Sequence, residues 1–203
     1  MKKIITLALA ALMCAGLAAC GGDKTTDNTD KTYIIYSDNA FAPFEYLDTE
    51  TNTYVGVDMD ILAAVAEDQG FTYELQYIGW DAAIAACQAG QADGMIAGAS
   101  ITDERKANGW TFSDGYYDAT QGMAVAKDSD IAGFADMAGK KIAVKNGTMS
   151  NEYAESIKEE YGFEVVTFST SPDMYQAVIG GQVDACLDDT PILKYNIKTG
   201  ELD

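Results

Sequence analysis

A short segment that occurs twice in the chain constrains the fold most. Residues 90–95 read GQADGM, and residues 181–186 read GQVDAC, 91 positions later. Each copy follows a stretch with helical periodicity and leads into an apolar run typical of a buried strand. The repeat therefore predicts two α/β lobes of similar build. Strands that alternate with helices further predict parallel or mixed sheets flanked by helices.

The expected lobes span residues 32–117 and residues 118–203. A hairpin is expected between residues 44 and 57, followed by a helix capped by Asp58. Ser150 is expected to cap a later helix, and residues 188–190 to form a loop before a helix opened by Pro191. The other expected strands are 32–36, 71–77, 93–97, 110–112, 121–126, 141–144, 164–168 and 183–187, with helices at 80–89, 134–138 and from 171 to Gly180.

The N-terminus has the pattern of an export signal. Lys2 and Lys3 precede an apolar run over residues 4–17, which is too short to span a membrane. Residues 17–20 resemble the bacterial lipobox, so we expect residues 1–19 to be a lipoprotein signal peptide and Cys20 to carry the lipid. Residues 20–31 are rich in Gly, Thr, Asp and Asn and are expected to form a flexible tether.

The charge balance excludes several classes of function. The chain of 203 residues has 13 Lys and Arg against 32 Asp and Glu, a formal net charge of -19. Such acidity argues against nucleic acid as a partner. The chain has no His, which excludes Ser-His-Asp and Cys-His catalysis and histidine-ligated metal. We therefore expect no metal site and no cofactor.

Two cysteines remain beyond the expected signal peptide and lipid site. Cys87 and Cys186 fall in different α/β units. A disulfide between them is conceivable outside the cell, but two separate thiols packed as small apolar side chains are the favoured interpretation.

Residues 98–105 carry the strongest local signal of a binding site. An apolar strand ends at Gly98, and a helix is expected to begin at Thr102 or Asp103. The unpaired N–H groups of a helix N-terminus attract anions, and Arg105 offers a planar donor suited to a carboxylate. The alternative is a capping box with a surface arginine.

Other polar and aromatic residues follow strands in both lobes, where parallel sheets commonly bind ligands. Taken alone, the aromatic residues could be core residues, the acids turn or cap residues, and Lys145 a solvated turn residue. Together they offer donors for a carboxylate and acceptors for an ammonium, as a free amino acid requires. The set is Asp38, Phe41, Trp80, Gly98, Ser100 and Arg105 in the first lobe, with Lys145, Gly147, Thr148, Asp188 and Asp189 in the second.

Several of these segments also carry a family resemblance. The chain resembles the bacterial extracellular solute-binding proteins of polar amino-acid ABC transporters, and most closely their glutamine-binding members. This resemblance implies a two-lobed Venus-flytrap fold that closes on its ligand. The matching segments are residues 37–45, 54–60, 101–106, 112–117, 144–148 and 189–191.

The resemblance also implies roles for the backbone end of an amino-acid ligand. Arg105, together with Gly98 and Ser100, would hold the α-carboxylate. Asp189 would hold the α-ammonium.

The ligand side chain would be held by a second group. The resemblance implies that Phe41 and Trp80 sandwich it, while Asp38 and Lys145 contact its polar tip. Thr148 and Met149 would lie in the loop that closes over the ligand.

Two departures from the glutamine-binding pattern affect specificity. Asp188 stands where those proteins have His, and Met149 where they have Gly. An additional acid favours a cationic side chain, whereas Lys145 opposes one, so glutamine and a basic amino acid both stay open. Members of the family also continue beyond the equivalent of Asp203, so a missing C-terminal part is expected.

The predicted function is to bind a free polar L-amino acid outside the cell membrane and deliver it to an ABC permease. The protein is expected to be a monomer, exported and lipid-anchored on the outer side of the membrane or in the periplasm. Binding without catalysis is expected. The alternatives are a dehydratase on the same fold, with Asp188 as its general acid, an amino-acid sensor lipoprotein, or a non-functional fragment.

Overall fold

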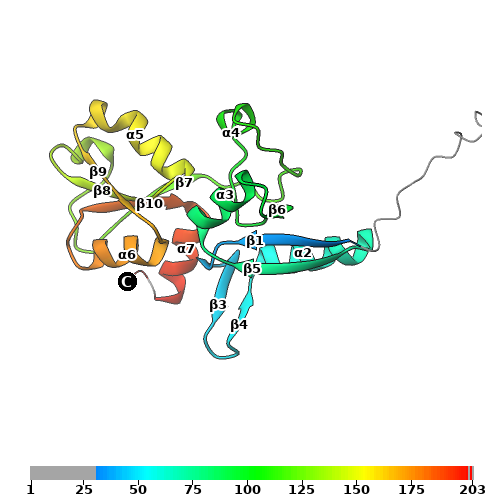
Figure 1. Cartoon of the computed structure of the whole chain (residues 1–203). Coiled ribbons are helices and arrows are strands. Elements are labelled where there is room, and N and C mark those ends of the chain that lie inside the picture. The colour runs from blue at the N-terminus through cyan, green and yellow to red at the C-terminus, as the bar shows by residue number, and fades with distance from the viewer. Residues whose placement is uncertain (1–30, 201, 203) are drawn as a thin grey trace, which may run out of the picture. The chain divides into compact units, whose positions relative to one another are not determined.

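A computed structural model describes residues 31–200 and residue 202. The expected signal peptide, the lipid site at Cys20 and nearly all of the tether lie outside the described residues. The first part of the described chain contains a three-stranded sheet (Figure 1). All of its strands are parallel, in the order β5 (Thr72–Tyr77), β1 (Thr32–Ser37), β6 (Gly94–Met95).

A four-stranded mixed sheet follows. Its order is β7 (Gln121–Val125), β10 (Ala185–Asp189), β8 (Lys141–Lys145), β9 (Glu164–Phe168). The strands β10, β8 and β9 run parallel, whereas β7 runs antiparallel to β10. Its three parallel strands are apolar along most of their length, as expected for strands covered on both faces.

A small antiparallel sheet stands beside the first one. It contains β2 (Ala40–Phe41), β3 (Glu45–Asp48) and β4 (Thr53–Val55), in that order. The turn between β3 and β4 is the expected hairpin, since Asp48 accepts the N–H groups of Glu50 and Thr51 at 2.8 and 3.3 Å.

The helices begin close to where sequence periodicity predicts them. Thr102 caps α4, and Thr170 caps α6, where Pro172 occupies the first turn. The helices are α2 (Val57–Gln69), α3 (Trp80–Gln88), α4 (Asp103–Ala107), the 3₁₀ helix η2 (Phe134–Asp136), α5 (Met149–Tyr161), α6 (Ser171–Ile179) and α7 (Thr190–Thr199).

Several local expectations were wrong. The cap of α5 is Thr148, whose Oγ1 accepts the N–H of Asn151, and Ser150 lies inside the helix. The capping position of α2 is Gly56, and Asp58 lies buried in the first turn. Residues 188 and 189 end β10 because they pair with β7, and residues 110–112, although described, form no strand.

Alternate residues of the four-stranded sheet face two separate cores. Ile142, Val144 and Leu187 pack with Ala154 of α5. The residues between them in sequence, such as Ala143 and Cys186, face α6. This period of two places one helical layer on each side of the sheet.

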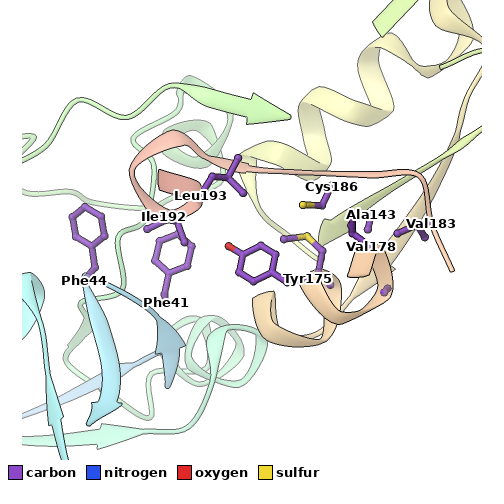
Figure 2. Packing of buried hydrophobic residues seen from close by; sticks show 11 residues of the cluster. Phe41, Phe44, Ala143, Tyr175, Val178, Val183, Cys186, Ile192 and Leu193 are labelled. Carbon is purple, nitrogen blue, oxygen red and sulfur yellow. The ribbon is translucent and has the colours of Figure 1, made fainter. Parts of the chain in front are cut away.

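The core on the α6 side extends to Phe41 and Phe44, at the start of the small antiparallel sheet. Figure 2 shows Phe41 and Phe44 beside Ile192 and Leu193 of α7. This packing joins the small antiparallel sheet to the second half of the chain. It places one face of Phe41 in a core and leaves the other for the site described below.

One further expectation can be compared with the described residues. Cys87 and Cys186 are both unpaired there, and Cys186 is buried. Between residues 31 and 200, no helix combines the length and apolar character needed to cross a membrane.

Candidate functional site

A pocket opens where strands of both larger sheets end. The space between its side chains, counted out to the solvent at its mouth, is about 340 Å³. Eleven of the twelve residues singled out in the sequence line it; the exception is Gly147, whose carbonyl accepts a hydrogen bond from Arg105. Ala97 and Ser150 line it as well. The eleven are Asp38, Phe41, Trp80, Gly98, Ser100, Arg105, Lys145, Thr148, Met149, Asp188 and Asp189.

Arg105 is the central cation of the pocket. Its side chain is buried, and it lies between the rings of Trp80 and Trp110, with Cζ 5.5 and 5.4 Å from the ring centroids. Its guanidinium donates hydrogen bonds to the carbonyls of Ser100 and Gly147, at 2.9 and 3.0 Å. Thr102 does cap this helix, but the alternative of a solvated surface arginine is excluded. Burial lowers the pKa of Arg105, whose ordinary value is so high that the group stays charged.

Lys145 and Asp38 form a buried ion pair in the same pocket. Each side chain is only 4% exposed. The Lys145 ammonium also lies 5.3 Å from the ring centroid of Phe41 and 5.7 Å from that of Trp80. Asp38 additionally accepts the N–H of Asn39 at 2.8 Å. The alternative of a solvated turn lysine is therefore excluded, and a cation already lies close to both rings.

Asp189 is held by residues that sequence reasoning missed. Gln121 donates a hydrogen bond from Nε2 to Asp189, and Ser150 donates one from Oγ to Gln121. Burial raises the pKa of Asp189, while Gln121 and the positive charges of Arg105 and Lys145 oppose the rise. Asp189 precedes α7, but within the described residues its carboxylate caps no N–H of that helix. An acceptor held in this way remains directed at the pocket.

Asp188 is satisfied by its own half of the chain. Its carboxylate accepts hydrogen bonds from the Tyr175 hydroxyl at 2.6 Å, the Ser171 hydroxyl at 3.2 Å and the Asp189 N–H at 2.8 Å. Burial raises the pKa of Asp188 to about 6. With three donors engaged on it, Asp188 supports the strand end instead of standing free as an acid for catalysis.

Replacing Asp188 by asparagine is expected to remove a pH dependence of stability. The pKa of Asp188 in the folded protein lies above its ordinary value of 3.8, so folding favours the protonated carboxyl. The contribution of Asp188 to the free energy of unfolding is therefore largest below pH 3.8 and is lost as the pH rises through about 6. At 1.36 kcal/mol per pKa unit, the wild type should lose up to about 3 kcal/mol relative to Asp188→Asn over this window. Denaturant unfolding at pH 4.5 and 7.5 should show about 2 kcal/mol of this loss, because the remainder occurs below pH 4.5. The exposed control Asp118→Asn should track the wild type, and an Asp188→Asn profile parallel to wild type would contradict the assignment.

Gly98 takes part in a way the sequence did not indicate. Its N–H donates to Asp58 Oδ2 at 2.8 Å, so it is not available to a ligand carboxylate. Its φ is +55°, and an added Cβ would lie 3.0 Å from Phe41 Cε1. Glycine is therefore required here by both backbone conformation and space. What Gly98 can offer a ligand is its carbonyl and a close approach to the main chain.

The rim and walls of the pocket complete its chemistry. Thr148 donates to the Lys145 carbonyl at 2.7 Å, which fixes the loop between β8 and α5. Met149 is 40% exposed and stands at the mouth. Trp80 Nε1 is buried and has no hydrogen-bond partner among the described residues, so it remains available as a donor. The sequence predicts Ser150 as a helix cap and not as a pocket residue that supports Gln121. The signal that could have indicated this role is its position soon after a strand.

The donor set suits a zwitterion more than a metal. Between residues 31 and 200, no group of three or more Cys, Asp or Glu residues is arranged to hold a metal ion. A guanidinium and a carboxylate share one buried pocket, with aromatic walls and an internal ion pair.

Residues 33–148 match the family model described as bacterial extracellular solute-binding proteins, family 3. The chain belongs to this family. The family-3 model covers more than half of the chain, and residues 111–190 also match a model described as NMT1/THI5 like. The arginine-binding extracellular protein ArtP of Bacillus subtilis (strain 168) is 31% identical over 188 residues, which are 92% of this chain and 72% of that protein.

Solved structures confirm the expected fold of this family-3 protein. An ancestral arginine-binding protein bound to arginine has a TM-score of 0.77 at 32% identity, covering 83% of this chain and 74% of that one. Substrate binding domain 2 of Lactococcus lactis GlnP, in an open conformation, has a TM-score of 0.55 at 40% identity, covering 84% and 73%. The chain thus spans about three quarters of the length of these similar proteins. Its fold is of the periplasmic-binding-protein type.

Proposed function

We propose that this family-3 protein binds a free L-amino acid in the pocket around Arg105. The observation that carries the proposal is that Arg105 and Asp189 share one buried pocket, each supported by neutral hydrogen-bond partners. A guanidinium binds a carboxylate with two parallel hydrogen bonds, and a carboxylate accepts from an ammonium. The carbonyl of Gly98 and the hydroxyl of Ser100 supply further contacts to the two charged groups of the ligand.

The side chain of the ligand is proposed to be polar and neutral, with glutamine the first candidate. The Lys145 ammonium lies close to the rings of Phe41 and Trp80 and is paired with Asp38. A carboxamide can accept from Lys145 and donate to Asp38 at once. An arginine side chain would bring a second cation beside Lys145, and like charges in a buried site repel strongly. Arginine, which ArtP is named for binding, is therefore the ligand to compare with glutamine.

Delivery to a membrane permease is proposed from the family. Solute-binding proteins of this kind work with ABC transporters, and we propose the same for this chain as a monomer. The lipid on Cys20 would keep it at the outer side of the membrane. The site is proposed to bind its ligand without turning it over. Asp188 is the residue expected to act as the general acid of a dehydratase, and its carboxylate already accepts three hydrogen bonds from its own half of the chain.

A thermal melt against a panel of the common amino acids tests the proposal. A ligand at one hundred times its Kd should add about 2.7 kcal/mol to the free energy of unfolding. Glutamine is expected to raise the melting temperature, and recovery of unchanged glutamine afterwards is expected to show that nothing has been turned over. A cooperative melt that no amino acid moves would overturn the amino-acid proposal. A rise with arginine but not glutamine would overturn the assignment of Lys145.

A further inference from the structure

Two acidic side chains, Glu45 and Asp58, lie buried together behind the pocket. Glu45 begins β3, Asp58 lies in the first turn of α2, and neither has any exposed surface. Among the described residues, no N–H or O–H donor reaches either oxygen of Glu45 or Oδ1 of Asp58. The amino-acid site described above does not use either residue directly.

Two adjacent buried carboxyl groups cannot both carry a charge without a large free-energy cost. Burial and the negative charges of Asp58 and Asp38 raise the pKa of Glu45 well above its usual range, and the Lys145 ammonium opposes this only weakly. Burial also raises the pKa of Asp58, but the Gly98 N–H and the neighbouring Tyr116 hydroxyl and Glu45 carboxyl favour its charged form. The surroundings therefore favour the neutral form of Glu45 over that of Asp58, and only a neutral Glu45 carboxyl could donate a hydrogen bond to Asp58.

The pair is connected to two groups that line the pocket. Asp58 Oδ2 accepts the Gly98 N–H at 2.8 Å. Glu45 pairs with Phe41 across β2 and β3. Gly98 and Phe41 in turn lie in contact, since a Cβ on Gly98 would come within 3.0 Å of the Phe41 ring.

Backbone hydrogen bonds also join the segments that carry Glu45 and Asp58. The N–H of Val57 donates to the Pro43 carbonyl at 3.1 Å, and the N–H of Asp58 donates to the Phe44 carbonyl at 3.0 Å. Three segments that are apart in sequence thus meet at two carboxyl groups: the hairpin, the start of α2 and the loop after β6.

We propose that Glu45 and Asp58 share one proton and act as a positioning pair, which holds the Gly98 main chain and the Phe41 ring in the shape the ligand pocket requires. The proposal rests on the proposed amino-acid site. Loss of the shared proton places two negative charges behind Gly98 and loosens that wall of the pocket. A neutral side chain at position 45 that still donates a hydrogen bond should keep the shape and lose the titration.

The sign of the pH effect follows from the retained proton. Above the ordinary pKa of 4.5, the unfolded chain releases the Glu45 proton and the folded chain keeps it. The wild type therefore loses stability relative to Glu45→Gln as pH rises from that value.

Nuclear magnetic resonance of the ligand-free protein tests the pair directly. The Glu45 carboxyl carbon is expected to have the shift of a protonated acid at pH 7, where an ordinary glutamate is ionised. On raising the pH, the Gly98 amide signal should move together with the Glu45 step. In Glu45→Gln that movement should disappear, while the exposed controls Glu50→Gln and Asp60→Asn should retain it.

Ligand affinity provides the second measurement. At pH 6.5, Glu45→Gln should bind L-glutamine with nearly wild-type affinity, whereas Asp58→Asn, which weakens the acceptor of the Gly98 N–H, should lose about tenfold. As pH rises to 8.5, the affinity of the wild type should fall relative to Glu45→Gln.

Three outcomes would decide against the pair. An ionised Glu45 at pH 7 overturns the shared proton, and a Gly98 signal that ignores Glu45 overturns the positioning role. Equal pH dependence of affinity in wild type and Glu45→Gln overturns the link to the pocket. Failure of the wild type to bind L-glutamine or L-arginine would instead count against the proposed function, because the two resonance signals are read without ligand.

Discussion

Arg105→Ala is expected to lower the affinity for the amino-acid ligand by at least about 100-fold. A hydrogen bond to a charged group contributes about 1.5–3 kcal/mol, and a guanidinium can make two to one carboxylate. Arg105 is buried between Trp80 and Trp110, so the lost contacts are not replaced by bulk water at full strength. Isothermal titration calorimetry with glutamine and arginine measures the loss.

Two control variants separate binding from folding. Arg105 also donates to the carbonyls of Ser100 and Gly147, so the melting temperature without ligand has to be recorded for each variant. Arg105→Lys keeps the charge without the planar fork and should lose less affinity than Arg105→Ala. Lys106→Ala, at the exposed neighbouring position, should bind as the wild type does. Wild-type affinity in a folded Arg105→Ala protein would contradict the proposed carboxylate contact.

Lys145→Met is expected to reverse the preference between glutamine and arginine. Removing one partner of a buried ion pair typically costs about 3–5 kcal/mol, because the other charge remains unpaired. Here the remaining charge is Asp38, in the pocket that Phe41 and Trp80 also line. An arginine ligand can restore the missing cation, whereas glutamine cannot. The ratio of glutamine to arginine affinity should therefore fall by about 100-fold or more.

Competition calorimetry with the two amino acids measures this ratio. Lys194→Met, at an exposed position of α7, serves as the matched control and should leave the ratio unchanged. The double variant Asp38→Asn with Lys145→Met removes both charges. It should be more stable than Lys145→Met alone, and its affinity for arginine should not increase. If Lys145→Met melts cooperatively and still prefers glutamine, the role of the ion pair in selecting the ligand is wrong.

Local sequence patterns were reliable where local forces decide the structure. The β-branched and aromatic run at 164–168 forms β9 as expected, and Thr102 caps α4 by accepting the N–H of Arg105. A capping side chain contacts a backbone group three residues away, so its signal is contained in the sequence. The same reasoning failed at Asp58, because an acid near a helix start gives the same pattern whether it caps that helix or binds a distant loop.

The short strand expected at 110–112 failed for a related reason. Apolar and aromatic residues there pack through their side chains, as Trp110 does against Phe112 and Arg105, without pairing to a neighbouring strand. A β-strand needs a partner, and the presence of a partner depends on the rest of the fold.

By itself, the sequence determined the two α/β halves and the residues that gather where their strands end. Period-two and helical patterns are set by which face of an element is buried, and each element carries that information locally. Only the tertiary structure decided which groups pair inside the pocket: Lys145 with Asp38, Gln121 with Asp189, and the Gly98 N–H with Asp58. In a buried site every polar group competes for the few partners within reach, and those partners come from segments that only packing brings together.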